Sequence, residues 1–271
     1  MYQLKTNNGM VWVSADALAA QEGLVHAFST RHGGKSTFPY ASLNLGLHTG
    51  DNISTVRDNR DRFLREFGIS PGEAVSLHFI HSNHVLPVSE RDGGKGYHTG
   101  DDALGNADGM ITNIPRRALV ITYADCIPIL FYDPAHRAIG ACHAGWRGTA
   151  AGIAMETVKT MQRIYGTNPA DLLAAVGPGI DPDHFEVGQD VYDAVSVHTP
   201  NPARLFRDKG GGKYLFDIWQ ANIDQLTTTG VPRAQITLID LSTYSRDDLF
   251  FSHRRRLGGN VGRQAAFIML S

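Results

Sequence analysis

Cysteine is scarce in this sequence. The chain has 271 residues and only two cysteines, Cys126 and Cys142, which lie 16 positions apart. A secreted protein of this length usually carries a framework of several disulfides, so the low count argues against a disulfide-stabilised extracellular protein. The spacing allows one bridge between the two cysteines, but a reducing compartment is the better interpretation.

Long apolar runs and an excess of one charge are also missing. No stretch approaches the roughly 20 apolar residues of a membrane-spanning helix, and the polar segment Met1–Asn8 lacks the apolar run of a signal peptide. The formal net charge is −2, which gives no reason to expect nucleic acid or a membrane as a partner. We therefore expect a cytoplasmic protein, while the sequence leaves its oligomeric state open.

The composition that is present is ordinary for a globular protein, with 42% hydrophobic and 19% charged residues. Apolar runs alternate with amphipathic patterns that end at glycine. The Gly- and Asp-rich segment Arg91–Asn106 is expected to be an ordered surface loop rather than a linker between domains. This irregular order predicts the α/β class, of the α+β type: a layered single domain over residues 1–271 with mixed β-sheets flanked by helices. The expected strands are Ala118–Tyr123, Ile127–Tyr132, Ala138–Ala144, Leu172–Val176, Gln235–Ile239 and Ala265–Leu270, and the expected helices are Thr55–Phe67, Thr149–Tyr165 and Asp217–Thr228.

The segment 122–149 is the densest in chemical groups. Cys126 lies at the turn between two expected strands, and His143 lies near the end of a third. Adjacent strand ends can bring the thiol and the imidazole side by side, as a metal site or a nucleophilic site requires. The turn Gly145–Gly148 then leads into a helix, whose N-terminal amides and dipole favour an anion beside Arg147. The alternative is structural, because a buried cysteine is usually a small hydrophobic residue.

Three further histidines and a basic run have less specific patterns. His78, His81 and His84 follow one another at intervals of three, a spacing that suits one face of a helix. A surface position is the simpler interpretation for the first and the last of them. The basic run 253–256 is usually a solvated face, but it lies between aromatic residues and a Gly-Gly turn, so it also suits the edge of a pocket.

Several stretches, in order over nearly the whole chain, resemble one protein family. They are FSTRHGG-S at 28–36, PYASLNLGLHTGD at 39–51, V--NR at 56–60, FIHSNHV at 79–85, ADGMIT at 107–112, TYADCIPILFYD at 122–133, ACHAGWRGTAAGI at 141–153, VGPGI----FEVG at 176–188 and FFSHRR----N-GRQAA at 250–266. The pair ADC-P and HAGWRGT is the most specific. The chain thus resembles the bacterial laccase-domain family, also called multicopper polyphenol oxidase-like or purine nucleoside phosphorylase-like, to which the human enzyme FAMIN belongs.

The resemblance implies a zinc ion bound by His81, Cys126 and His143. It implies phosphorolysis of purine nucleosides (adenosine, inosine, guanosine and 5′-methylthioadenosine), hydrolytic deamination of adenosine, and a three-layer or four-layer architecture. Two segments depart from the family pattern. Residues 79–82 read Phe-Ile-His-Ser where Gln-Val-His-Gly is common, and residues 242–243 read Ser-Thr where Cys-Thr is common. Neither departure removes a metal ligand.

The chemistry suggests roles for further residues. Three protein ligands leave one position of a tetrahedral zinc open, which is the arrangement of catalytic zinc sites. Phosphorolysis also needs cationic groups that hold phosphate near C1′ of the ribose. Purine nucleosides and phosphate are therefore the expected partners. The expected catalytic residues are Cys126, His143, Arg60 for phosphate and Asn44 for a sugar hydroxyl, and the expected substrate-binding residues are Arg31, Arg147, His253 and Arg254.

Three other functions stay open at this point. Two histidines and a cysteine also bind copper, but a multicopper oxidase needs a further cluster of about three coppers, and none of the twelve histidines forms a His-X-His pair. Cys126 and His143 also suit the nucleophile and the base of a metal-free hydrolase. The last possibility is a regulatory protein that binds a nucleotide or a metal in the same pocket without turnover.

Overall fold

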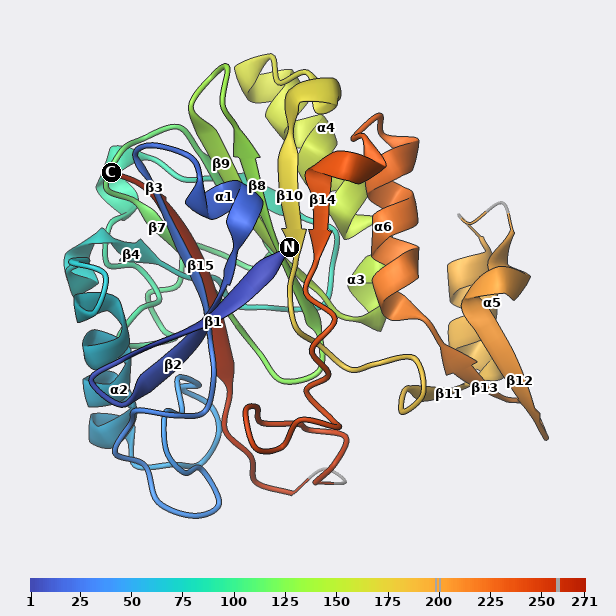
Figure 1. The fold of residues 1–271 in the computed structure, drawn as a ribbon, viewed down its shortest axis with the longest axis horizontal. Helices are drawn as coiled ribbons and strands as arrows, with labels where there is room; N and C mark the ends of the chain where they lie inside the picture. The colour runs from blue at the N-terminus through green and yellow to red at the C-terminus, as the bar shows by residue number, and fades with distance from the viewer. Residues whose placement is uncertain (198, 200, 257–258) are drawn as a thin grey trace.

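Two six-stranded sheets form the centre of the molecule (Figure 1). The computed structural model describes residues 1–197, 199, 201–256 and 259–271. Strands of the first sheet are antiparallel to their neighbours except at its edge, where β4 and β7 are parallel. Its strand order is β1 (Tyr2–Asn7), β2 (Met10–Ala15), β3 (Leu24–Ser29), β15 (Gln264–Leu270), β7 (Ala118–Tyr123) and β4 (Ala74–Val75).

The second sheet is also mixed, because its two edge strands are parallel to their neighbours and the inner strands are antiparallel. Its order is β14 (Ile236–Leu238), β10 (Leu173–Val176), β8 (Ile127–Asp133), β9 (Ala138–Ala144), β6 (Gly109–Thr112) and β5 (Val85–Pro87). The helices are α1 (Asp16–Ala19), α2 (Ile53–Arg65), α3 (Trp146–Ala150), α4 (Ile153–Tyr165), α5 (Gln189–Ser196) and α6 (Ile218–Thr228).

Helices and sheets stack in four layers. Phe63 and Leu64 of α2 pack on one face of the first sheet. The other face of that sheet packs on the second sheet, where Ile121 of β7 and Leu130 of β8 share a cluster. The far face of the second sheet is covered by α4 and α6, through residues such as Val158. Strand β8 is buried on both faces, which explains why residues 127–132 form a continuous apolar run instead of an alternating one.

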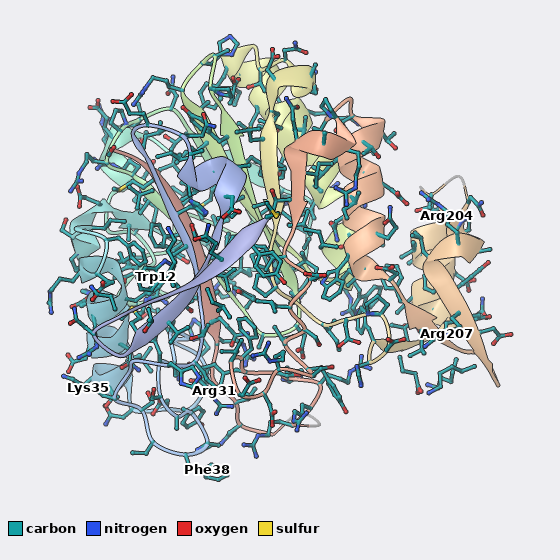
Figure 2. All side chains as sticks on the ribbon, viewed as in Figure 1. Trp12, Arg31, Lys35, Phe38, Arg204 and Arg207 are labelled. Atoms are coloured by element: carbon teal, nitrogen blue, oxygen red, sulfur yellow. The ribbon has the colours of Figure 1, made fainter. Side chains whose placement is uncertain are left out.

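A smaller three-stranded sheet projects from one side of these layers (Figure 1). It consists of β11 (Glu186–Gly188), β13 (Lys213–Phe216) and β12 (Phe206–Gly210), and α5 packs on it. Arg204 and Arg207 lie on this projection (Figure 2). Phe185, which precedes β11, packs against Phe216 and turns the projection toward the main body. Within the described residues, no helix is both long and apolar enough to cross a membrane.

The expected layered α/β class with mixed sheets is confirmed, and β7 and β9 have the expected bounds. One expected helix is wrong. The segment Thr149–Tyr165 belongs to two helices, α3 and α4, because Gly152 between them adopts a left-handed φ of 82°. The histidines at 78, 81 and 84 do not share a helix face either, since they lie in an irregular segment where His81 has a φ of 60°.

Strand β3 carries a buried histidine that makes stability depend on pH. His26 is 5% exposed, and its Nε2 accepts a hydrogen bond from the Ala15 N–H at 2.9 Å. Burial, with a smaller contribution from Lys5, lowers the pKa of His26 from 6.5 to about 4. The unfolded chain therefore binds a proton at a higher pH than the folded chain, so this stability is present above pH 6.5 and is lost as the pH falls toward 4. We expect the free energy of unfolding to fall by about 2 kcal/mol between pH 7.5 and pH 5.

Chemical denaturation at the two pH values measures this effect. His26→Gln keeps an acceptor for the Ala15 amide and removes the titratable ring, so its free energy of unfolding should change much less over the same interval. An equal change in both proteins would show that another group is responsible.

Candidate metal centre

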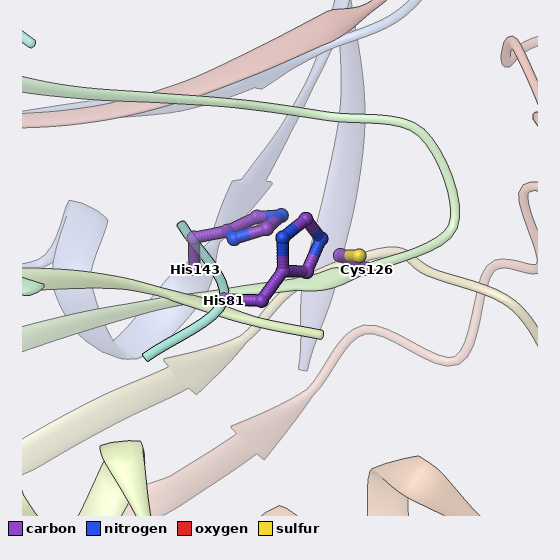
Figure 3. A group of neighbouring side chains, drawn as sticks. All are labelled: His81, Cys126 and His143. Atoms are coloured by element: carbon purple, nitrogen blue, oxygen red, sulfur yellow. The ribbon is translucent and has the colours of Figure 1, made fainter. Parts of the chain in front are cut away.

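Three side chains from separate parts of the chain meet at one end of the second sheet. Cys126 lies in the turn between β7 and β8, His143 lies in β9, and His81 lies in the irregular segment before β5. Because β8 pairs with β9 so that Pro128 faces His143, the preceding turn places Cys126 beside that histidine. One donor atom from each of the three residues lies within 4.8 Å of the other two (Figure 3). The predicted proximity of Cys126 and His143 is confirmed.

A single carboxylate, Asp108, bonds to two of these residues, to the side chain of His143 and to the backbone of His81. Its Oδ1 accepts from His143 Nδ1 at 3.0 Å and from the His81 backbone N–H at 3.0 Å. Its Oδ2 accepts from the backbone N–H of Ser82 at 2.6 Å and of Ile80 at 3.2 Å. Since Nδ1 of His143 donates to Asp108, its Nε2 is the nitrogen that faces the centre, as in carboxylate–histidine–metal arrangements. The sequence analysis missed Asp108, although it belongs to the matched stretch 107–112.

The charges at the centre favour a thiolate. Burial alone would raise the pKa of Cys126, but His143 and His81 beside it lower it to about 6. Burial alone would lower the pKa of His143, whereas the Cys126 thiolate and Asp108 raise it to about 9. Each of the two groups therefore favours the charged form of the other. A thiolate is the form in which cysteine binds metals, and a metal ion held here would take the place of a proton on His143 Nε2.

The turn that presents Cys126 is strained and firmly anchored. Asp125 has a φ of 86°, a conformation that costs a residue with a side chain on the order of 1–3 kcal/mol. Its carboxylate accepts from the Thr243 hydroxyl at 2.7 Å and from the Arg254 backbone N–H at 2.7 Å. Thr243 is the threonine of the Ser-Thr pair that departs from the family pattern, so the residue that holds the turn is retained. The strain is consistent with a turn that positions a functional side chain.

Two cavities flank the three side chains, and His81, Ala124, Cys126 and His253 line both. The apolar cavity has a volume of about 290 Å³, and its walls include Trp146, Ile180, Phe185 and Ile218. The other cavity is the more polar of the two, and we call it the polar cavity. It has a volume of about 310 Å³, and its walls include His48, Thr49, Thr122, His143 and Arg263. The centre is thus reached from an apolar side and from a polar side.

Three of the predicted substrate-binding residues lie at the apolar cavity: Arg147, His253 and Arg254. The Arg147 guanidinium stacks on Trp146 at 4.2 Å, and that of Arg254 lies 5.1 Å from the Phe185 ring centre and donates to the Glu186 carbonyl. The sequence analysis missed Arg263, whose Nη1 donates to the carbonyls of residues 261 and 262. Burial lowers the pKa of Arg263, while Cys126 and Asp125 oppose that change.

The other predicted residues, Asn44, Arg31 and Arg60, do not line the apolar cavity. Asn44 is fully buried, and its amide is saturated: it donates to Thr49 and Asp51 and accepts from the N–H groups of Gly46 and Arg263. These bonds use every donor and acceptor of the Asn44 amide, so they add no support to its expected contact with a sugar hydroxyl, which stays a prediction.

Arg31 lines a separate small cavity that shares no residue with the two at the metal centre. It donates to the carbonyls of Ala41 and Asp247 and lies over the Phe251 ring at 4.7 Å. Its expected contact with substrate stays a prediction. Arg60 lines a third cavity, which adjoins the polar one.

The second cysteine points into the core. Cys142 is fully buried in the cluster between the second sheet and α4, and burial raises its pKa to about 12. We expect Cys142→Ala to bind as much metal as the unchanged protein, because neighbours on a strand point to opposite faces. The small void should lower the free energy of unfolding by about 1 kcal/mol. Elemental analysis and denaturation measure both effects, and loss of metal would show that Cys142 is a ligand.

The three donors fit one transition-metal ion. Two imidazole nitrogens and one thiolate suit zinc or copper, the donor atoms converge, and Asp108 fixes the orientation of one imidazole. In the part of the chain that the structure describes, no other group of three or more His, Cys, Asp or Glu side chains is close enough to hold a metal. The fold and the site thus define a four-layer α/β protein with one mononuclear centre that can hold a metal, set between two cavities.

Comparison with known proteins gives the family. Residues 25–271 match the family described as multi-copper polyphenol oxidoreductase laccase, and the chain belongs to this family. It is 36% identical to a purine nucleoside phosphorylase of Bacteroides thetaiotaomicron over 94% of both chains. It is 39% identical to purine nucleoside phosphorylase YfiH of Escherichia coli over 92% of this chain and 95% of that protein. The crystal structure of YlmD from Geobacillus stearothermophilus is similar, with a TM-score of 0.91, 34% identity and coverage of 98% and 97%.

Proposed function

We propose that this protein is a zinc-dependent purine nucleoside phosphorylase. The observation that carries the proposal is a centre of two histidines and one cysteine between an apolar and a polar cavity, in a chain whose relatives bear that enzyme name. A nucleoside has the matching polarity, since its purine is flat and largely apolar and its ribose carries hydroxyls. The substrates are adenosine, inosine, guanosine and 5′-methylthioadenosine, with inorganic phosphate as the second substrate.

The reaction joins phosphate to the sugar and releases the base. A phosphate oxygen forms a bond with C1′ while the bond between C1′ and the purine N9 breaks. The electron pair of that bond leaves with the purine, and the proton of hydrogen phosphate ends on the base. The products are the free purine and ribose 1-phosphate, or 5-methylthioribose 1-phosphate when 5′-methylthioadenosine is the substrate. Chain groups must therefore hold the base, the sugar and the phosphate in line at C1′.

Each cavity has a role in this proposal. Trp146 and Phe185 bind the purine in the apolar cavity, with Arg147, His253 and Arg254 at its edge. Thr49, Thr122 and Arg263 bind the ribose in the polar cavity. His81, Cys126 and His143 hold zinc, which when bound supplies a Lewis acid between the two. Asp108 keeps His143 oriented with its Nε2 toward the centre. The lining runs from Gly46 to Arg263, which supports one domain over the whole chain.

We also assign adenosine deamination to the same centre, because its ligands line the cavity given to the base. The free thiols of Cys126 and Cys142 suit a reducing compartment, and we assign the protein to the cytoplasm. Copper-dependent phenol oxidation is the alternative that the family description names. It receives less support, because the described residues offer a single metal-binding group where a multicopper oxidase needs further copper sites.

A nucleoside panel with and without phosphate tests the proposal. Inosine, which has no exocyclic amine, should give hypoxanthine and ribose 1-phosphate only when phosphate is added. Adenosine should give adenine with phosphate and inosine without it. Chromatography of bases and nucleosides measures hypoxanthine, adenine and inosine. Absence of phosphorolysis with every purine nucleoside, together with copper-dependent phenol oxidation, would show that the proposal is wrong.

A further inference from the structure

A third cavity adjoins the polar one and shares no lining residue with the apolar one. Its volume is about 130 Å³, and it shares Leu47, His48, Phe79 and Thr122 with the polar cavity. Its other walls include Arg60, His78 and Gly96, and we call it the Arg60 chamber. The apolar and polar cavities share the metal ligands His81 and Cys126. The three spaces therefore follow one another, with the metal centre between the first and the second.

Arg60 is a buried cation without an acidic partner. It is 3% exposed and extends from α2, with its guanidinium over the Tyr97 ring at 4.4 Å. Its Nη1 donates to the Leu45 carbonyl at 2.7 Å, and its Nη2 reaches the Gly96 carbonyl only at 3.5 Å. Among the residues with described positions, none accepts a hydrogen bond from its Nε and no carboxylate forms an ion pair with it. Burial lowers the pKa of Arg60, which reflects the cost of this charge.

The rest of the chamber suits a small oxyanion. The His48 and His78 rings lie at its mouth, with centroids 6.4 Å apart, and both side chains are exposed. None of the described residues that line it is Asp or Glu. An anion that enters therefore meets three nitrogen-bearing side chains and no acidic group. A buried, uncompensated guanidinium gains strongly from a charge-assisted hydrogen bond to such a group.

We propose that the Arg60 chamber binds the inorganic phosphate that attacks C1′, with Arg60 as its main ligand and His48 and His78 at its entrance. This inference rests on the proposed function, and it adds the position of the second substrate. Displacement at C1′ requires the base, the sugar and the phosphate in line. The apolar cavity, the polar cavity and the Arg60 chamber supply that order. The phosphate oxygen that faces the polar cavity forms the new bond to C1′, the purine leaves into the apolar cavity, and the phosphate proton ends on the purine.

Direct binding of inorganic phosphate to the full-length, zinc-loaded protein tests the chamber without turnover. Calorimetric titration in a chloride buffer of fixed ionic strength should detect phosphate, and Arg60→Met should weaken its binding about ten- to a hundredfold. Met keeps an apolar stem over Tyr97. His78→Gln changes a residue at the exposed mouth of the chamber. This second variant should weaken phosphate binding about threefold or more. Arg62→Gln removes a charge from an exposed position of the same helix and should change phosphate binding less than twofold.

Kinetics separate this inference from the proposed function. Arg60→Met and His78→Gln should raise the KM for phosphate by the factors above and change the KM for inosine less than twofold. If the protein catalyses phosphorolysis and neither variant changes the KM for phosphate, the inference that phosphate binds in the Arg60 chamber is wrong and the proposed function stands. If both variants weaken phosphate binding but the protein catalyses no phosphorolysis, the phosphate site in the Arg60 chamber is supported and the proposed function is wrong. Adenosine 5′-monophosphate is titrated in parallel, and variant-dependent binding of the nucleotide without binding of inorganic phosphate would overturn the inference.

Discussion

Cys126→Ser is expected to lose the bound metal and the phosphorylase activity together, while the fold persists. A serine hydroxyl does not ionise near neutral pH, so the site loses its only anionic donor. The change is nearly isosteric, and the carboxylate of Asp108 still holds His81 and His143. We expect metal affinity to fall by about a hundredfold or more, since changes that affect only the partners of metal ligands already cost about ten- to a hundredfold. Elemental analysis and the inosine assay measure the two losses.

Cys142→Ala is the matched control, because it removes a thiol from the fully buried position next to His143 and should keep the metal. A circular dichroism spectrum that matches the unchanged protein shows that Cys126→Ser is folded. Full activity of the unchanged protein in a verified metal-free sample would contradict the account. That result would favour the hydrolase in which Cys126 is the nucleophile and His143 the base.

Gly145→Ala is expected to have a comparable effect through a single added methyl group. A Cβ atom at Gly145 would lie 2.8 Å from His81 Cδ2 and 2.9 Å from Cys126 Sγ, closer than side chains approach one another. Both neighbours belong to the proposed metal centre, so the clash is relieved by moving its donor atoms. The backbone at Gly145 has a φ of −72°, which alanine adopts freely, so the effect is on the site and not on the turn. We expect metal affinity to fall about ten- to a hundredfold.

Competition with a chromogenic chelator measures this affinity. Gly72→Ala is the control, because the added Cβ meets no atom within 4 Å among the described residues and its φ lies outside the left-handed region. It should leave the affinity within about twofold. An unchanged affinity in Gly145→Ala would mean that the metal lies away from this turn.

The central strands could be predicted because their signal is strong. Residues 118–123 and 127–132 are β-branched and aromatic runs, and residues 138–144 are a run of mostly small residues. Turns separate the three runs, which form β7, β8 and β9. The first strand was missed because β1 is mostly exposed, so its side chains show no apolar run. The division of residues 149–165 into two helices depends on the left-handed conformation of Gly152, and glycine also occurs within helices, so the sequence does not settle it.

Strand spacing predicts that Cys126 and His143 lie close together, and the family resemblance adds His81 as a third ligand. The residues around these three could not be predicted in the same way. Asn44 and Arg31 were chosen for their polar side chains, but the structure uses those side chains to bond loop carbonyls, carboxylates and amides. Asp108 lies 35 positions from His143, and nothing in the sequence indicates that one carboxylate bonds to two of the three residues. Whether a polar side chain has all its hydrogen bonds filled, and how a ligand ring is oriented, depends on residues that folding brings together from distant segments.

Return of zinc to the stripped protein tests the central claim most directly. The protein is freed of metal with a chelator, shown by elemental analysis to be metal-free, and titrated with zinc while phosphate-dependent release of hypoxanthine from inosine is recorded. The account predicts no activity at the start, a linear rise, and a plateau at one zinc per chain, with no such recovery in Cys126→Ser. Full activity before zinc is added, or a plateau reached only with copper and with phenols as substrate, would contradict it.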